Sequence, residues 1–339
     1  MLIFNSPLST CLLYVLITIV TIFILNKVIT SNNAKPSYAS SNYNNKQSKI
    51  NVAFVGNSIQ YFQDLPRFIE VLSSYTIYQN SCLRPTATLT SILKKGNGMK
   101  TIFNTSKALL DDGVTYDIGS SDVYSLLLGG GSYINNYNNN NWDYVVLNDR
   151  TYYPAKNSTR AKTIQTLKTS YAPIFQSIGA IPIFISTHAY RAPSNQTKNL
   201  GDIYTYTSLV SQGVEEYAQV LSAFLPNNQS ARVAHVGKAF QIIYKENYTL
   251  WYNLFNIDNY HPSPHGTYLQ GCIVYCTIFD NELPDENIAL PNNPASLFDY
   301  SRVMQPIGWT SGGDYLPKPT LEEAQYLYSV AGRVCCGEE

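Results

Sequence analysis

The amino-acid sequence predicts an α/β protein, a three-layer α/β/α sandwich in which helices cover both faces of a mostly parallel central sheet. Three observations lead to this prediction. From Ile50 onward, short apolar segments alternate with helical patterns. The segments "VAFV" at 52–55 and "YVVL" at 144–147 are apolar throughout, as strands buried on both faces are. No internal repeat interrupts the alternation, so residues 50–339 are expected to form one domain.

Each expected element follows from its local pattern. Runs rich in β-branched and aromatic residues predict strands at 51–55, 143–147, 181–186 and 232–236. Helical periodicity and cap residues predict helices at 64–75, 88–95, 122–128, 158–178, 203–224, 238–245, 262–279 and 320–334. Between the third helix and the second strand, the low-complexity segment "GGGSYINNYNNNNW" is expected to be an exposed loop.

The first 49 residues divide into an apolar segment and a polar linker. Leu8–Leu25 carries no charge over 18 residues, near the lower limit for a membrane-spanning helix and longer than most signal-peptide cores. Residues 1–30 are therefore predicted to be a signal-anchor or a cleaved signal peptide, and 31–49 a disordered linker. The protein is expected in the secretory pathway, secreted or held in the membrane by this single segment.

Sequons and cysteines agree with that compartment. Five Asn-x-Ser/Thr sequons are candidate glycosylation sites, at Asn104, Asn157, Asn195, Asn228 and Asn247. One or two disulfides tying the pair Cys335 and Cys336 to the domain would suit an oxidising environment, whereas Cys272 and Cys276 could equally be buried thiols. The formal net charge is zero, so no nucleic-acid partner is expected.

Residues that can carry chemistry follow the predicted strands. In "NVAFVGNSIQ", Ser58 comes directly after a strand and a small turn, where α/β sheets present functional groups. A serine hydroxyl needs a base to act as a nucleophile. Far downstream, "IDNYHPSPHG" places Asp258 three residues before His261, a spacing that lets the carboxylate hold the imidazole and stabilise the imidazolium.

These motifs resemble those of the SGNH/GDSL hydrolases, and the resemblance covers nearly all of residues 50–279. "VGNSIQ" is similar to the first block of the family, which implies that Ser58 is the nucleophile. "DNYHPSPHG" resembles the last block, which implies that Asp258 and His261 complete a catalytic triad. "VVLND" resembles the third block, which implies that Asn148 lends its side-chain amide to the oxyanion hole. Each block is short, but their order and separation agree with the family.

One block departs from the family. Its second block supplies a glycine backbone N–H to the oxyanion hole, and here Pro85 and Thr86 stand where two glycines are expected before "ATL". Proline has no N–H, so Thr86 is the expected donor beside the N–H of Ser58.

The resemblance implies a flavodoxin-like fold and a serine esterase that hydrolyses acyl esters without a metal or cofactor. Acetyl or short acyl esters on carbohydrate are the substrates it suggests, and other small-molecule esters remain open. The alternative is a catalytically weak or inactive module of this fold that binds a glycan or a surface partner. The departure at Pro85 and Thr86 favours that alternative.

Neighbouring residues have two interpretations each. His188 ends a predicted strand on the functional side of the sheet, where it could line the substrate pocket or be a satisfied structural residue. Tyr61, just after the nucleophile, could form a pocket wall or pack in the core. Asp149 and Arg150, next to Asn148, are interpreted as a surface ion pair.

Overall fold

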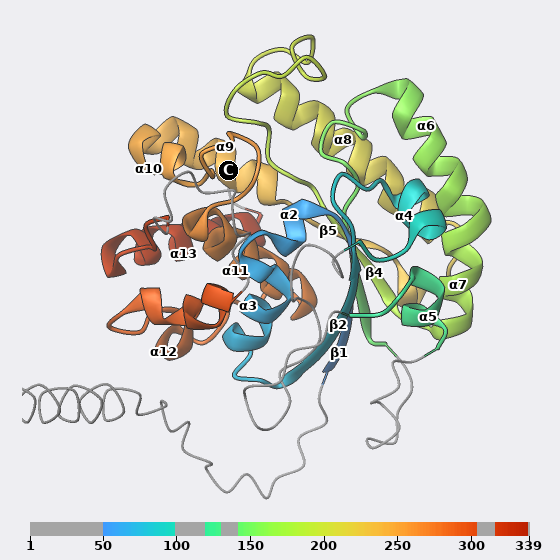
Figure 1. Ribbon diagram of the computed structural model, residues 1–339, viewed down its shortest axis with the longest axis horizontal. Helices are drawn as coiled ribbons and strands as arrows, with labels where there is room; N and C mark the ends of the chain where they lie inside the picture. Colours follow the sequence, from blue (N-terminus) through green and yellow to red (C-terminus); the bar gives the residue numbers. More distant parts are fainter. Residues whose placement is uncertain (1–49, 99–118, 130–141, 304–315, 338–339) are drawn as a thin grey trace, which may run out of the picture. The chain divides into compact units, whose positions relative to one another are not determined.

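The computed structural model describes residues 50–98, 119–129, 142–303 and 316–337 (Figure 1). The predicted leader and polar linker, the sequon at Asn104 and most of the Asn-rich loop lie outside these ranges. Among the residues that are described, no helix combines the length and the apolar character needed to span a membrane.

A parallel sheet forms the middle layer of the described structure. Its strands are β1 (Ile50–Gly56), β2 (Ile77–Leu83), β3 (Tyr144–Leu147), β4 (Ile181–Ile185) and β5 (Arg232–Ala234). They lie in the order β2-β1-β3-β4-β5, and every neighbouring pair is parallel. This is the flavodoxin-like order, in which the chain reverses direction across the sheet between β1 and β3. The predicted fold class is therefore confirmed.

Helices cover both faces of this sheet (Figure 1). On one face lie α3 (Leu65–Leu72), α9 (Val236–Glu246), α10 (Tyr248–Asn253), α11 (Pro264–Ile278), α12 (Glu286–Ala289) and α13 (Leu321–Cys335). On the other lie α4 (Leu89–Lys95), α5 (Val123–Leu127), α6 (Asn157–Thr166), α7 (Ala172–Ile178) and α8 (Ile203–Ser222). A single turn, α2 (Ser58–Tyr61), and a 3₁₀ turn, η1 (Phe62–Asp64), connect β1 to α3.

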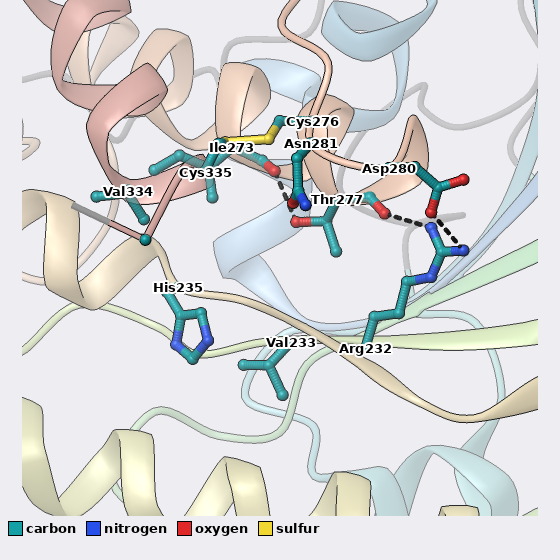
Figure 2. A pocket seen from close by; sticks show the side chains of 11 residues that line it. Arg232, Val233, His235, Ile273, Cys276, Thr277, Asp280, Asn281, Val334 and Cys335 are labelled. Atoms are coloured by element: carbon teal, nitrogen blue, oxygen red, sulfur yellow. Dashed lines mark hydrogen bonds and ion pairs between the residues drawn. A yellow bond between two sulfur atoms is a disulfide. The ribbon is translucent and has the colours of Figure 1, made fainter.

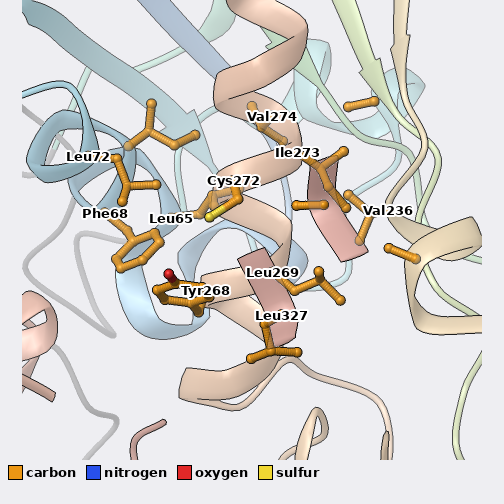
Figure 3. Close-up of a cluster of buried hydrophobic side chains, with 14 of the residues drawn as sticks. Leu65, Phe68, Leu72, Val236, Tyr268, Leu269, Cys272, Ile273, Val274 and Leu327 are labelled. Carbon is orange, nitrogen blue, oxygen red and sulfur yellow. The ribbon is translucent and has the colours of Figure 1, made fainter. Parts of the chain in front are cut away.

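Side chains of β1 pack alternately into the two hydrophobic cores. Val52 and Phe54 pack into the core that contains α3, α9 and α11, shown in Figure 3, whereas Ala53 and Val55 pack into the opposite core. Gly271 of α11 allows α11 to approach α3 closely, because a Cβ there would lie 2.4 Å from the ring of Phe68. Burial on both faces explains why the strand is apolar throughout.

The short elements α10, α12 and η6 (Pro294–Val303) were not predicted, and two further differences have identifiable reasons. The edge strand β2 was not predicted, because Gln79, Asn80 and Ser81 interrupt its apolar pattern; all three are nonetheless buried. The long helix expected at 158–178 forms, but a π-helical turn at Leu167–Tyr171 separates α6 from α7. Pro173 is the second residue after this turn, and a proline lacks the N–H that a regular helix would use there.

The cysteines and sequons can now be placed. Cys276 of α11 and Cys335 of α13 form a disulfide, which ties the C-terminal pair to the domain through one of its two members. Cys272 is a buried thiol and Cys336 an exposed one. The four sequon asparagines within the described residues are all exposed, namely Asn157, Asn195, Asn228 and Asn247. Their glycosylation stays a prediction.

Candidate active site

Ser58 stands at the start of α2, immediately after the carboxyl end of β1. Asn57 caps this turn, since its side chain accepts a hydrogen bond from the Ile59 N–H at 3.1 Å. Gly56 is required before it, because a Cβ at this position would lie 1.9 Å from Oδ1 of Asn148. Ser58 is 9% exposed, and its side chain is hydrogen-bonded to that of Tyr61. Tyr61 is therefore both a buried residue and a direct neighbour of the candidate nucleophile.

Asp258 and His261 form a close carboxylate–imidazole couple. Oδ2 of Asp258 lies 2.5 Å from Nδ1 of His261, and Oδ1 accepts the backbone N–H groups of Tyr260 and His261 at 2.9 and 3.0 Å. Burial acts to raise the pKa of Asp258, but the hydrogen bonds from His261 and its backbone outweigh it and leave this pKa below its ordinary value. An ionised carboxylate at Nδ1 favours the tautomer with its proton there, in which Nε2 is unprotonated, as a general base requires.

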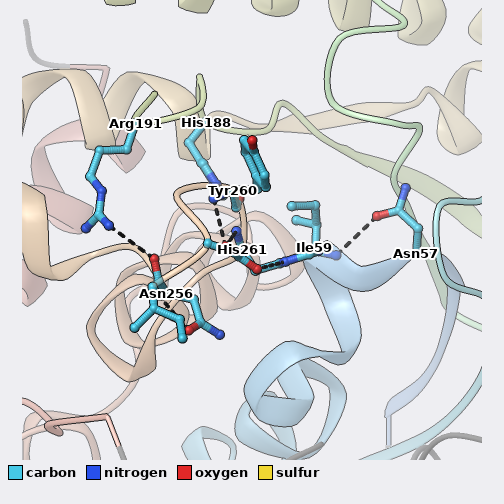
Figure 4. A network of polar contacts seen from close by, with 9 residues as sticks. Asn57, Ile59, His188, Arg191, Asn256, Tyr260 and His261 are labelled. Carbon is cyan, nitrogen blue, oxygen red and sulfur yellow. Dashed lines mark hydrogen bonds and ion pairs between the residues drawn. The ribbon is translucent and has the colours of Figure 1, made fainter. Parts of the chain in front are cut away.

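Contacts between distant segments bring this couple to α2. The ring of Phe62 stacks on that of His261, with centroids 3.8 Å apart and planes at 4°. In addition, Nε2 of Gln270 in α11 donates to the carbonyl oxygen of Ile59 at 3.2 Å. Figure 4 shows Ile59 and His261 at the same place in the fold. The imidazole thus lies against the short segment that carries Ser58.

The loop after β4 holds the couple from the other side (Figure 4). Nε2 of His188 lies 2.9 Å from the Tyr260 carbonyl oxygen, and Nε of Arg191 donates to Oδ1 of Asn259 at 2.6 Å. His188 is fully buried and stacks on Phe240, and this burial lowers its pKa to about 4, so the ring is neutral. His188 lies beneath the loop that carries His261, a position that supports the structural interpretation of this residue.

Asn148 lies at the end of β3, next to Ser58, inside a saturated network. Its Oδ1 accepts from the Asn57 N–H at 3.1 Å and from Nε2 of Gln60 at 2.8 Å. Its Nδ2 donates to Oδ1 of Asn57 at 2.8 Å and to the Asp149 carbonyl oxygen at 3.0 Å. Both N–H groups of this amide are used within the protein. Asn148 therefore links the ends of β1 and β3, and one of its N–H groups would have to turn to reach an oxyanion.

The turn at Pro85 and Thr86, where two glycines are expected from the resemblance, has a backbone conformation that glycine favours. Ala87 donates to the Arg84 carbonyl oxygen at 3.2 Å, and Thr86 within this turn has a φ of 57°. Left-handed φ at the third position of a turn is the conformation that glycine favours. Nδ2 of Asn57 donates to the Ala87 carbonyl oxygen at 2.9 Å, so the turn lies beside Ser58. The Thr86 N–H has no hydrogen-bond acceptor among the described residues.

Asp149 and Arg150 do not form the expected surface ion pair. The Asp149 carboxylate is buried and is bound by four other donors, namely the N–H groups of Leu89 and Arg150 and the hydroxyl groups of Thr163 and Tyr217. Burial raises the pKa of Asp149, although these donors act in the opposite direction. The interpretation of the pair was wrong because Thr163 and Tyr217 are far away in the sequence.

A cavity of about 440 Å³ lies elsewhere, beside β5 and the C-terminal ends of α11 and α13 (Figure 2). The disulfide lines it, but none of the candidate catalytic residues does. Arg232 lines the cavity, but its guanidinium is already bound to Asp280 at 2.8 Å and to the carbonyl oxygen of Thr277 at 2.9 Å. This cavity therefore offers no free charge to a ligand and is not the candidate active site.

Neither a protein-family model nor a curated protein matches the sequence. Among solved structures, a DUF4886 family protein from Bacteroides uniformis is similar with a TM-score of 0.53 and 14% identity, over 86% of this chain and 96% of that one. A candidate SGNH hydrolase from Slackia heliotrinireducens has a TM-score of 0.45 and 17% identity, over 68% and 99%. The likeness to the first protein is one of fold. In this flavodoxin-like sheet, Ser58 follows β1, and Asp258 and His261 precede α11, at the positions that the motifs predict.

Proposed function

We propose that this protein is a serine hydrolase that cleaves acyl esters with Ser58, His261 and Asp258. The observation that supports this most directly is the 2.5 Å contact between Asp258 and His261 on an imidazole that stacks against the segment of Ser58. The side chains of His261 and Asp258 are 15% and 24% exposed, so a substrate can reach them. The proposed mechanism further requires that the Ser58 hydroxyl donate a hydrogen bond to Nε2 of His261.

The reaction would proceed in two balanced steps. Ser58 Oγ attacks the ester carbonyl carbon while Nε2 of His261 takes its proton, and Asp258 stabilises the imidazolium. The tetrahedral intermediate then expels the alcohol, which receives that proton from His261, and an acyl-serine remains. Water attacks the acyl-serine with His261 again as the base. The acid leaves, and the proton returns to Ser58.

The oxyanion would be held by three donors around Ser58. Two of them are backbone donors, the Ser58 N–H at the start of α2 and the Thr86 N–H. The third is the side-chain amide of Asn148, which would first exchange one of its present hydrogen bonds for one to the oxyanion. Each such donor is worth about 100- to 1000-fold in rate. Acetyl or other short acyl esters on a glycan are the proposed substrates, in the secretory pathway or at a membrane surface.

Labelling and hydrolysis together test the proposal. Full-length protein is treated with a fluorophosphonate probe and assayed with p-nitrophenyl acetate, next to the Ser58→Ala variant. We expect labelling at Ser58, and we expect Ser58→Ala to abolish both labelling and hydrolysis. Equal hydrolysis by the two proteins, with no label on Ser58, would reject the serine mechanism. The binding module without turnover would then be the remaining interpretation of the fold.

A further inference from the structure

Arg150 is a half-buried cation for which the described residues supply no carboxylate partner. It follows Asn148 and Asp149 at the carboxyl end of β3, and its guanidinium lies 5.0 Å from the ring centroid of Tyr152. The neighbouring carboxylate of Asp149 is bound by other donors. Across the described ranges, no acidic side chain forms an ion pair with Arg150.

Arg150 lies at the edge of the candidate active site. The side chain of Asn57, which precedes the nucleophile, donates to the carbonyl oxygen of Asp149 at 3.1 Å. On the other side, Arg150 acts electrostatically on Tyr190, whose ring lies 4.8 Å from that of Tyr260. Tyr260 is the residue before His261. Arg150 thus follows a residue that is bonded to Asn57, and it lies near Tyr190, whose ring contacts the residue before the candidate base.

A second cation and an unpartnered hydroxyl lie beside it. The ammonium group of Lys156 lies 5.1 Å from the ring centroid of Tyr152, so Tyr152 has two cations near its ring. Tyr206 contacts Tyr190 edge to face, with centroids 6.0 Å apart. Tyr206 is only 5% exposed, and its hydroxyl has no hydrogen-bond partner within the part of the chain that the structure describes. Lys156 already donates to the carbonyl oxygen of Gln196, so Arg150 is the cation at this rim for which the described residues supply no acceptor.

A half-buried guanidinium loses part of its hydration, and a single aromatic ring compensates for only part of that loss. A carboxylate compensates fully, because the planar fork of arginine matches its two oxygens. We propose that Arg150 binds a carboxylate of the substrate, so that the ester cleaved at Ser58 belongs to an acidic molecule. This inference rests on the proposed hydrolase function and narrows its substrates to anionic esters, such as those of acidic glycans.

The test compares pairs of esters that differ in whether they carry one carboxylate. One pair, 3-carboxyphenyl acetate and 3-carbamoylphenyl acetate, carries the difference in the alcohol. A second pair, monophenyl adipate and phenyl hexanoate, carries it in the acyl group. We expect kcat/KM of the full-length protein to favour the carboxylate by about 10- to 100-fold in at least one pair, as one charge-assisted hydrogen-bonded contact provides. No preference in either pair would overturn the proposal.

Variants assign the preference to this side chain. Arg150→Gln should bring the ratio of kcat/KM within the preferred pair close to one, and Arg150→Lys, which keeps the charge without the fork, should give an intermediate ratio. Lys168→Gln, an exposed cation of the turn between α6 and α7, is the matched control and should keep the wild-type ratio. If this ratio of kcat/KM is unchanged in Arg150→Gln, a group other than Arg150 binds the carboxylate and the proposal is wrong. Circular dichroism confirms that each variant is folded.

A binding measurement separates failure of this inference from failure of the proposed function. Titration calorimetry of 3-acetamidobenzoate and 3-acetamidobenzamide needs no turnover. We expect tighter binding of the carboxylate and a loss of about 10-fold in its affinity in Arg150→Gln. This result would support the role of Arg150 even if Ser58 proves inactive. Equal binding of the two compounds would reject the role of Arg150 even if Ser58 is the nucleophile.

Discussion

The two halves of the candidate site differ in how ready they are for catalysis. In the proton-transfer half, Asp258 and His261 are already in contact, and Oδ1 of Asp258 accepts two further backbone hydrogen bonds. In the oxyanion half, the amide of Asn148 is fully used by Asn57, Gln60 and Asp149, whereas the Thr86 N–H has no acceptor within the described ranges. The motif around His261 thus supplies a carboxylate–imidazole pair already in contact, whereas the motif around Asn148 supplies a residue whose amide also links β1 to β3.

Sequence separation explains the difference. Asp258 and His261 are three residues apart, and the turn between them, with Asn259 at a φ of 70°, suffices to bring the carboxylate to the ring. The partner of Asn148 across the sheet, Asn57, is 91 residues away. A contact between a motif residue and its neighbours in the sequence can thus be predicted more reliably than a contact with a distant strand.

The largest effect is expected from breaking the proton-transfer half. Asp258→Asn keeps the size of the side chain but removes the charge that holds the proton on Nδ1 of His261. We expect kcat for p-nitrophenyl acetate to fall by about 1000- to 10,000-fold, because the imidazole then presents the wrong tautomer. Asp285→Asn, a helix cap distant in sequence from the couple, serves as the control and should retain activity. A loss below 10-fold would mean that His261 does not depend on Asp258.

An intermediate effect is expected from Asn148→Ala, which tests whether the oxyanion half combines two tasks. This change leaves the buried N–H of Asn57 and one N–H of the Gln60 side chain without an acceptor, which costs about 2–4 kcal/mol of unfolding free energy. We also expect kcat to fall by about 100-fold, since one oxyanion donor is lost. Urea unfolding and steady-state kinetics measure the two effects separately. Lost stability with unchanged kcat would assign a purely structural role to Asn148 and leave the oxyanion to backbone donors.

The smallest and most specific effect concerns the support beneath His261. The folded pKa of His188 is about 4, below its ordinary value of 6.5, because the ring is buried. Below pH 6.5 the unfolded chain takes up a proton that the folded chain refuses, so this contribution to stability is complete above pH 6.5. It is lost as the pH falls towards 4, by about 3 kcal/mol in all.

His188→Gln provides the comparison, because glutamine does not titrate and its amide can still donate to the carbonyl oxygen of Tyr260. Urea unfolding of both proteins between pH 7 and pH 4 isolates the contribution of His188, since all other groups cancel in the difference. We expect the wild-type protein to lose about 3 kcal/mol more than the variant over this range. Parallel losses would show that His188 is protonated as easily in the folded state as in the unfolded one.

By itself the sequence determined the fold class, the position of Ser58 at the end of β1 and the pairing of Asp258 with His261. These features depend on local patterns: apolar runs that end in small turns, and two side chains separated by one turn of backbone. It missed β2, because Gln79, Asn80 and Ser81 look exposed until α3 and the segment at 119–121 cover them.

Only the tertiary structure decided what Asn148, Asp149, Arg150 and His188 do. Thr163 and Tyr217 bind the carboxylate of Asp149, and this leaves the guanidinium of Arg150 without its nearest counterion. His188 is buried against Phe240 beneath the loop that carries His261, which supports the structural one of its two interpretations. The physical reason is the same in each case. A buried polar group takes whichever donor or acceptor the fold brings to it, and those partners come from segments that no local pattern connects.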